Sequence, residues 1–263
     1  MLGAIAGDII GSRFERGNHK GKDFELFTAN SRFTDDTILS VAIADAIMQK
    51  KDFAKTMKQY ARAYPNGGYG DRFNQWARSE ATEPYNSWGN GSAMRVSPVG
   101  FVYTERARVE AVAQQTAEVT HNHPEGIKGA QATAVMILLA KEFKNKNLIR
   151  TAIESAFGYN LSRSLADIRP SYTFDVSCQG SVPEAMISFL EANSFEEAVR
   201  NAISLGGDTD TMGSIAGAIA EAFYGKVPDP IAKASLAKLD EPLRTVTLAF
   251  CEQYTHPYNT LLQ

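Results

Sequence analysis

Two short acidic motifs, one near each end of the chain, hold the side chains best suited to chemistry. They are Thr34-Asp35-Asp36-Thr37 and Gly207-Asp208-Thr209-Asp210-Thr211, and an apolar segment with helical character follows each of them. Carboxylate and hydroxyl oxygens are the ligands that Mg²⁺ and Mn²⁺ accept in octahedral sites. The sequence therefore indicates one or two divalent cations where the motifs meet.

Helix capping is the alternative explanation for both motifs. Asp and Thr side chains accept hydrogen bonds from the free amides of a first helical turn, so Thr34 or Asp35 would cap one helix and Asp208 or Thr209 another. A cap needs only one oxygen, however, whereas each motif carries two acids. Several carboxylates brought together raise one another's pKa values unless a cation offsets their charge. Helix N-termini are also electropositive, so a cation there depends strongly on the number of carboxylates. The residues alone favour the metal site only modestly.

Helical periodicity dominates the segments that must position these motifs. Residues 52–63 and 105–119 alternate charged and apolar faces at three-to-four spacing, and residues 126–143 present one broad apolar face. Pro183 is placed in the first turn of a helix over 184–191. No alternating pattern predicts strands. We therefore expect an all-α fold in a single domain, residues 1–263, with further helices over 37–49, 195–205, 211–224 and 230–254, the last as one helix or two.

Polar and glycine residues gather in four predicted loops, 64–92, 120–126, 170–182 and 206–210. The first of these is long and rich in aromatic residues. Loops of that length in a compact domain are usually functional or disordered, and the aromatic content favours function.

Composition limits the classes of partner. The chain has 263 residues, 44% of them hydrophobic, and a net charge of −3, which gives no overall basic field for nucleic acid, although a local basic patch remains open. The cysteines, Cys178 and Cys251, form no CxxC motif, so we expect a reducing, cytoplasmic compartment. The first residues lack the basic start of a signal peptide, and no apolar run reaches 18 residues, so we expect no membrane span.

Five motifs together resemble the ADP-ribosylglycohydrolase family, which includes the dinitrogenase reductase-activating glycohydrolase. They occur in the order of the family and span most of the chain: Gly7–Glu15, Phe33–Thr37, Trp88–Arg95, Thr120–Pro124 and Leu205–Thr211. The resemblance implies an all-helical fold with two Mg²⁺ or Mn²⁺ ions in a central cleft. It also implies the metal ligands, which would be Thr34, Asp35 and Asp36 from one side and Asp208, Asp210 and Thr211 from the other.

The same resemblance assigns roles to residues around the ligands. Thr37 and Thr209 would support the ligands or cap their helices, and Glu15 would lie close to the metals, where it would gate the cleft or handle a proton. For Glu15 the alternative is a solvent-facing side chain after a glycine turn.

The Gly89-Asn90-Gly91 loop is the candidate for substrate binding. Glycines let a backbone approach a ligand closely and present amides to phosphate oxygens. A dinucleotide-binding fingerprint would need a third glycine where Met94 stands, so that interpretation fails. A tight turn before Pro98 is the structural alternative. The resemblance implies that the loop holds the diphosphate and ribose, with Trp88 or Tyr85 stacked on the adenine, or else serving as a half-buried loop anchor.

Histidines complete the set of candidates. Isolated histidines are more often structural or exposed than catalytic, and the oxygen ligands already suffice for a metal. The resemblance favours His121 as a polar contact to the ligand, and His123 less strongly. The full set of predicted substrate-binding residues is Ser87, Trp88, Gly89, Asn90, Gly91, Ser92, Met94, His121 and His123.

The implied activity is metal-dependent hydrolysis of the glycosidic bond that joins ADP-ribose to a protein side chain or a small molecule. Asp35 or Glu15 would accept the proton of the attacking water. Two alternatives remain: a non-catalytic ADP-ribose-binding or structural member of the same fold, and a metal-dependent phosphohydrolase. We expect a monomer. The correspondence of Asp71 to an extra acid found in some members is doubtful, so the sequence leaves the linkage open.

Overall fold

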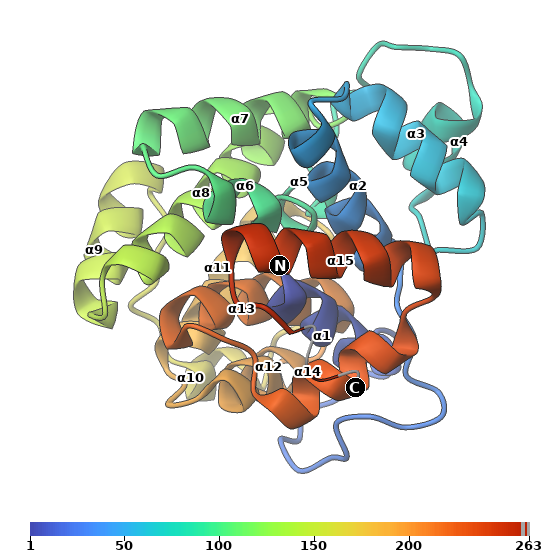
Figure 1. Cartoon of the computed structure of the whole chain (residues 1–263). Helices are drawn as coiled ribbons and strands as arrows, with labels where there is room; N and C mark the ends of the chain where they lie inside the picture. The colour runs from blue at the N-terminus through green and yellow to red at the C-terminus, as the bar shows by residue number, and fades with distance from the viewer. Residues whose placement is uncertain (259–260, 262–263) are drawn as a thin grey trace.

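The computed structural model describes residues 1–258 and 261, and within them the chain is helical with no β-strand, as expected (Figure 1). An isolated bridge between Gly89 and Ser177 is the one extended pairing in those residues. The helices are α1 (Leu2–Gly11), α2 (Asp35–Gln49), α3 (Phe53–Ala63), α4 (Asp71–Arg78), α5 (Gly91–Met94), α6 (Ser97–Val102), α7 (Arg106–Glu118), α8 (Pro124–Glu142), α9 (Lys146–Phe157), α10 (Leu165–Ile168), α11 (Cys178–Leu190), α12 (Phe195–Ile203), α13 (Thr209–Tyr224), α14 (Asp229–Lys238) and α15 (Glu241–Tyr254).

An antiparallel pair, α1 and α13, forms the centre of the fold. Every residue of α1 is buried. The pair is unusually close because glycines face each other: a Cβ on Gly7 would lie 1.9 Å from the Gly213 carbonyl oxygen, and a Cβ on Gly3 would lie 2.3 Å from that of Gly217. Only glycine permits such backbone contact. The C-terminal end of α1 therefore lies directly beside the N-terminal end of α13.

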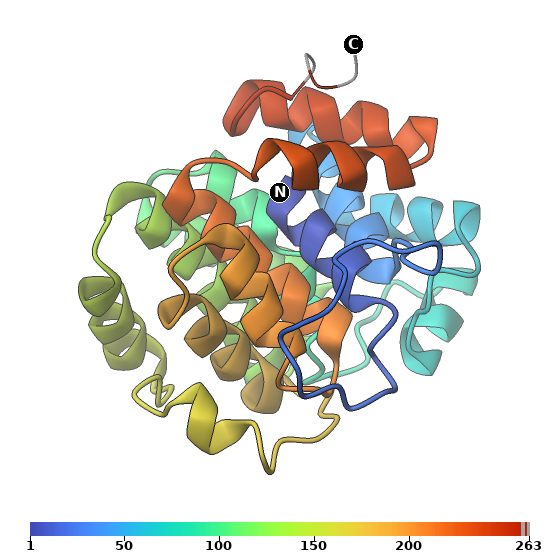
Figure 2. The same ribbon diagram turned by 90° about the horizontal axis from the view of Figure 1, so that it is seen from below.

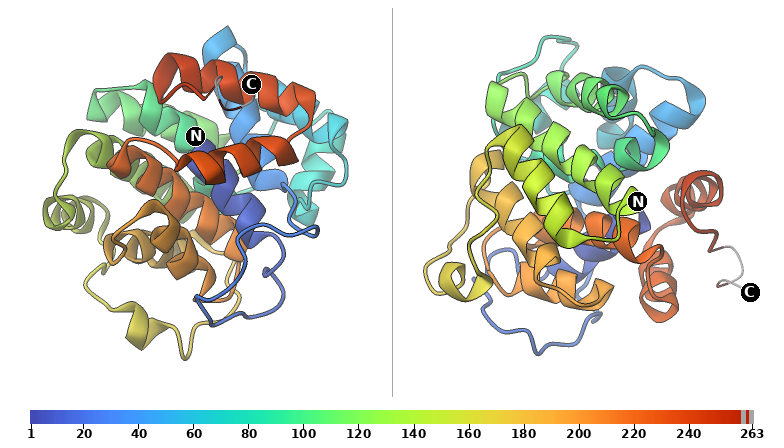
Figure 3. Two further views of the ribbon diagram at one scale, coloured as in Figure 1. Left: turned by 60° about the horizontal axis from the view of Figure 1, so that its bottom comes forward. Right: turned by 90° about the vertical axis from the view of Figure 1, so that its left-hand side faces the viewer.

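The remaining helices surround this pair. α8, α11 and α12 pack on α13, and α2 and α14 pack on α1. Figures 2 and 3 show the segments 12–34 and 158–177, which are irregular apart from α10, on one side of the molecule. The N-terminal ends of α2 and α13 both reach the interior next to the end of α1, so the fold brings the two acidic motifs together.

The structure contains several helices that were not predicted, among them α6 and α9, and it moves the start of one predicted helix. The N-terminal apolar segment forms α1, which was not predicted, and α4 lies within the predicted 64–92 loop. The predicted loop 170–182 ends at Ser177, whose hydroxyl caps α11 by accepting from the Gly180 amide at 3.1 Å. Pro183 consequently lies inside α11 and not in its first turn.

The length and hydropathy of each helix show whether it could span a membrane. Within residues 1–258 and at 261, the structure contains no helix whose length and apolar character would suffice to cross a bilayer.

Candidate metal centre and substrate loop

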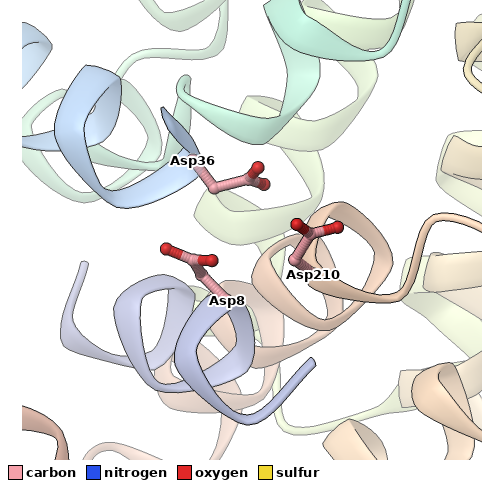
Figure 4. A group of neighbouring side chains, drawn as sticks. All are labelled: Asp8, Asp36 and Asp210. Carbon is pink, nitrogen blue, oxygen red and sulfur yellow. The ribbon is translucent and has the colours of Figure 1, made fainter. Parts of the chain in front are cut away.

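Three carboxylates converge from the three helices that meet at the centre of the fold. Asp8 of α1, Asp36 of α2 and Asp210 of α13 each offer an oxygen, and these oxygens lie within 4.8 Å of one another (Figure 4). The three residues are at most 5% exposed. A second group, Glu15, Asp208 and Asp210, meets the same distance limit and shares Asp210 with the first. The two motifs that the sequence singled out do lie together.

Asp8, which the sequence analysis did not select, organises the start of α2. Its Oδ1 accepts from the Thr34 hydroxyl at 2.7 Å, and its Oδ2 accepts from the Thr34 amide at 2.9 Å, the Thr37 amide at 3.1 Å and the Thr37 hydroxyl. The available signal was an acid inside an otherwise apolar run. Such an acid must be paired or hydrogen-bonded when it is buried.

The first turn of α2 divides its two acids. Thr34 is the N-cap and accepts from the Asp36 amide at 3.4 Å, so the capping interpretation holds for Thr34. Asp36 faces the carboxylate group and accepts from the Thr211 hydroxyl at 3.3 Å. Asp35 is half-buried, belongs to neither group of converging acids, and lies beside Gly68. Adjacent carboxylates therefore occupy different surroundings.

The start of α13 is built differently. Asp208 is the N-cap, but it makes no capping hydrogen bond through its side chain. Gly206 and Gly207 precede it with φ of 72° and 78°, a region that favours glycine. The Asn90 side-chain amide donates to Asp208 Oδ2 at 2.8 Å. Thr209 donates to the Gly11 carbonyl at 2.9 Å, which ties this turn to the end of α1.

Burial and mutual repulsion perturb these acids. The pKa values of Asp36 and Asp210 are raised well above the usual range, first by burial and then by neighbouring carboxylates. Burial raises the pKa of Asp8 to about 6 despite its hydrogen bonds to Thr34 and Thr37. The pKa of Asp35 rises to about 8 through burial and the charges of Asp8 and Asp208.

The group lacks the positive charge that would relieve this repulsion. Among residues 1–258 and 261, no lysine or arginine forms an ion pair with Asp8, Asp36 or Asp210. Asp36 Oδ1 is buried with no hydrogen-bond partner. An all-oxygen donor set with an unpartnered buried carboxylate oxygen fits a hard divalent cation.

Glu15 lies at the edge of this group. It follows α1, is half-buried, and lies within 4.8 Å of Asp208 and Asp210 through one carboxylate oxygen. Burial and the charge of Asp208 raise its pKa. Glu15 therefore lies beside two acids of the second motif.

The loop that carries Gly89-Asn90-Gly91 adjoins the acidic group. It is paired with the 174–177 segment, because the Asn90 amide donates to the Val176 carbonyl at 2.7 Å and the Cys178 amide donates to the Trp88 carbonyl at 2.9 Å. Trp88 is 48% exposed, so its ring is accessible. The bond from Asn90 to Asp208 joins this loop directly to the second acidic motif.

The other predicted binding residues lie around the loop but differ in exposure. Ser87 is half-buried, and its hydroxyl accepts from the Gly89 amide at 3.1 Å. Ser92 and Met94 are buried; Ser92 donates to the Gly126 carbonyl at 2.7 Å. His123 caps α8 by accepting from the Glu125 amide at 3.1 Å, which matches the structural alternative for an isolated histidine.

His121 is 5% exposed and lies against the loop, with its Nε2 atom next to Gly89 and Gly91. Burial and the charges of Arg95 and Arg72 hold its pKa well below the ordinary value. The imidazole is consequently neutral near pH 7.

Sequence comparison with known proteins matches the family that the five motifs resemble. A family model described as ADP-ribosylglycohydrolase matches residues 1–259. ADP-ribosylhydrolase ARH3 of Gallus gallus is 27% identical, with 88% of this chain and 85% of the relative covered. ADP-ribosylhydrolase ARH3 of Homo sapiens is 26% identical, with 87% and 86% covered. An ADP-ribosylarginine hydrolase of Pseudomonas putida is 25% identical, with 86% of this chain and 69% of the relative covered.

A solved structure described as an ADP-ribosylglycohydrolase-related protein complex shares the fold. It superimposes with a TM-score of 0.71 at 24% identity, and 95% of this chain and 96% of that chain are covered. At this identity the likeness establishes the all-helical architecture.

Proposed function

This chain belongs to the ADP-ribosylglycohydrolase family, and we propose that it hydrolyses the glycosidic bond between ADP-ribose and a modified protein side chain or another acceptor. Relatives whose names describe ADP-ribosylhydrolases support the proposal. The observation that carries it is the buried group Asp8, Asp36 and Asp210 beside the Gly89–Gly91 loop, with Asn90 bonded to Asp208 between them. The candidate cation site and the loop proposed to bind the sugar and phosphates are thus in direct contact.

Two divalent cations, Mg²⁺ or Mn²⁺, are the proposed cofactors. Their proposed ligands are the six oxygen donors of the two motifs: Thr34, Asp35, Asp36, Asp208, Asp210 and Thr211. Thr34 and Thr37 donate hydrogen bonds to the Asp8 carboxylate, which helps to position the first set of ligands. When bound, such cations offset the carboxylate charge and supply Lewis-acid polarisation.

Asp35 and Glu15 are the proposed proton acceptors. Both are half-buried, unlike Asp8, Asp36 and Asp210, so they combine access with a perturbed environment. Their pKa values are raised, which makes each carboxylate a stronger base than a solvated one. The water oxygen would bond to the anomeric carbon of the ribose as a carboxylate takes its proton. The bond to the acceptor breaks, the acceptor leaves with a proton, and ADP-ribose is released through an oxocarbenium-like transition state.

The substrate loop supplies the proposed contacts to the rest of ADP-ribose. Gly89 and Gly91 allow close approach of a diphosphate to the backbone. Trp88 has an accessible ring for stacking on adenine, and Tyr85, which is half-buried, packs near His121 with ring centroids 6.0 Å apart. The exposure of Trp88 favours it as the stacking residue. We also propose that residues 1–263 act as one domain, because α1 and α13 join its two ends.

Product analysis tests the activity. The protein should be incubated with ADP-ribosylated arginine and serine peptides, with Mg²⁺, with Mn²⁺ and with a chelator. We expect intact ADP-ribose as the product and no turnover in chelator. AMP as the product would identify a phosphohydrolase, and binding of ADP-ribose without turnover of any adduct would identify a non-catalytic member.

Substitution of the acidic group tests the site. The double change Asp36→Asn and Asp210→Asn should lower kcat/KM by roughly three orders of magnitude or more, because both halves of the cation site lose charge. It should also abolish the increase in melting temperature on adding Mg²⁺. Glu142→Gln, at an exposed position of α8, is the matched control. Retained turnover in the double variant would exclude this site.

A further inference from the structure

A buried chain of hydrogen bonds leads from Arg95 to His121 behind the substrate loop. The Arg95 guanidinium donates through Nη2 to Thr120 Oγ1 at 2.8 Å and to the Thr116 carbonyl at 3.1 Å. Thr120 Oγ1 in turn lies 2.7 Å from His121 Nδ1. Arg95 and Thr120 are both 0% exposed, so water does not compete for these bonds.

The obligate donor at one end of this chain sets its direction. A guanidinium has no acceptor atom, so Thr120 Oγ1 must accept from Arg95. The single hydroxyl proton of Thr120 is then available for His121 Nδ1, the ring nitrogen within 2.7 Å. The Tyr85 and Thr120 side chains also hydrogen-bond, a contact that lowers the pKa of Tyr85. When the Thr120 proton points to His121, Nδ1 accepts and the proton of the neutral ring is on Nε2.

The Nε2 atom faces the glycines of the substrate loop. A Cβ at Gly91 would lie 3.2 Å from Nε2, and a Cβ at Gly89 would lie 3.5 Å from it. Across residues 1–258 and 261, Nε2 has no hydrogen-bond partner, whereas Nδ1 has one. A Cβ at either position would crowd this nitrogen, and a ligand atom that reaches its N–H must be an acceptor.

We propose that Arg95 and Thr120 are positioning residues that fix His121 as an Nε2–H donor to a phosphate oxygen of the substrate. The inference rests on the proposed function for the identity of the ligand. Two cations, Arg95 and Arg72, lie near enough to depress the pKa of His121, so the neighbourhood favours an anionic acceptor. The arrangement also excludes His121 as the base of the reaction, because the nitrogen facing the loop carries the proton.

NMR of the histidine side chains tests the tautomer directly. In wild-type protein, the ¹⁵N shifts of His121, identified by their loss in His121→Gln, should show protonated Nε2 and unprotonated Nδ1. Thr120→Val removes the hydroxyl with little change in shape and should produce a mixture of tautomers. Thr120→Ser keeps the hydroxyl and should restore the wild-type spectrum. A wild-type ring protonated on Nδ1 would overturn the inference, whether or not the protein binds ADP-ribose.

Calorimetric titration with ADP-ribose tests the consequence for binding. A glutamine amide nitrogen lies as many bonds from Cβ as histidine Nε2, whereas the asparagine nitrogen corresponds to Nδ1. His121→Gln should therefore bind within about threefold of wild type, and His121→Asn should lose roughly tenfold or more, as expected for a hydrogen bond to a charged group. Thr120→Val should weaken binding about fivefold and Thr120→Ser should not. Equal affinities of the Gln and Asn variants, or of Thr120→Val and wild type, would refute the role.

The two kinds of failure are distinguishable. If wild-type protein binds no ADP-ribose, the proposed function fails while the tautomer measurement still stands. If wild type binds ADP-ribose and the variants show no such differences, the positioning role alone fails.

Discussion

The two acidic helix entrances have nearly the same composition but are held in different ways. At α2, the buried Asp8 carboxylate receives four hydrogen bonds from Thr34 and Thr37, and Thr34 also caps the helix. At α13, Asp208 makes no side-chain cap, and the turn depends on Gly206 and Gly207 with positive φ. The first entrance is positioned by a buried acid of α1, whereas the second combines the glycine backbone conformation with single hydrogen bonds from Asn90 and Thr209. Similar motifs can therefore have unlike sensitivities to substitution.

Forcing α1 and α13 apart should have the largest effect, because both acidic helix entrances depend on their contact. In Gly7→Ala the new Cβ would lie 1.9 Å from the Gly213 carbonyl, and backbone has no side chain that can rotate away. We expect a loss of about 4 kcal/mol in the free energy of unfolding, together with loss of the Mg²⁺-dependent shift in melting temperature. Urea denaturation and thermal melts measure both.

Gly70→Ala is the control for that change. Beyond its chain neighbours, no atom lies within 4 Å of the position that a Cβ on Gly70 would take, and its φ is −59°. Its unfolding free energy should stay close to wild type. A Gly7→Ala protein as stable as the control would mean that close contact between α1 and α13 is not required.

Replacing Asp8 should affect the α2 entrance selectively. Asp8→Asn places an amide N–H₂ among the donors of Thr34 and Thr37, so we expect a loss of about 2–3 kcal/mol in chelator. Asp208→Asn should lower the unfolding free energy less. The amide oxygen of the new asparagine can still accept from Asn90, and the change removes a buried charge. Urea titrations of both metal-free variants give the comparison. Equal losses would show that the two entrances are held alike.

Much of this arrangement could be predicted from sequence. The helical period gave the fold class, and the positions of Asp and Thr indicated that the two motifs meet. The chain start was missed because α1 is buried on all sides and so lacks an amphipathic pattern. α4 was missed because glycine and aromatic residues flank its short sequence.

The role of Asp8 could not be predicted from spacing, since it depends on tertiary contacts with Thr34 and Thr37. The predicted ligand set, two acids and a threonine from each side, does not include Asp8 for the same reason. Sequence shows which side chains can serve as ligands. It does not show which buried acid receives hydrogen bonds from the others, because that depends on the approach of helices far apart along the chain.

The pH dependence of the metal-free protein sharpens the contrast between hydrogen-bonded and repelled carboxylates. Raised pKa values mean that the folded state binds protons more tightly than the unfolded chain. The stability that these groups contribute is therefore fully present at low pH and is lost as pH rises through the folded values, about 6 for Asp8 and about 8 for Asp35.

Between pH 5.5 and 8.5 in chelator, we expect the unfolding free energy to fall by roughly 1–3 kcal/mol from these groups. Asp210→Asn should flatten the profile, because it removes one repelling charge from Asp36. Thermal melts across this range measure the effect, and saturating Mg²⁺ should oppose it. A wild-type profile as flat as that of the variant would contradict the expectation.

Removing the cap of α2 should produce the smallest effect. Thr34→Val loses the capping oxygen and the bond to Asp8, and we expect a cost of about 1 kcal/mol. Thr34→Ser retains the hydroxyl and is the matched control. Urea denaturation in chelator compares them, and indistinguishable midpoints would show that the Thr34 hydroxyl is not needed to hold the start of α2 on Asp8.

The pairing of α1 with α13 also has a consequence for the order of events during synthesis. Gly11 and Thr209, which are hydrogen-bonded, are 198 positions apart, so the residues between them must be made before the pair can form. At typical elongation rates this interval is roughly 10–40 s. During this interval the glycine face of α1 cannot pack on α13, and Asp8 cannot approach Asp210. Long-range closure of this kind is also intrinsically slow. On the ribosome, the carboxylate group is therefore completed only after α13 has emerged.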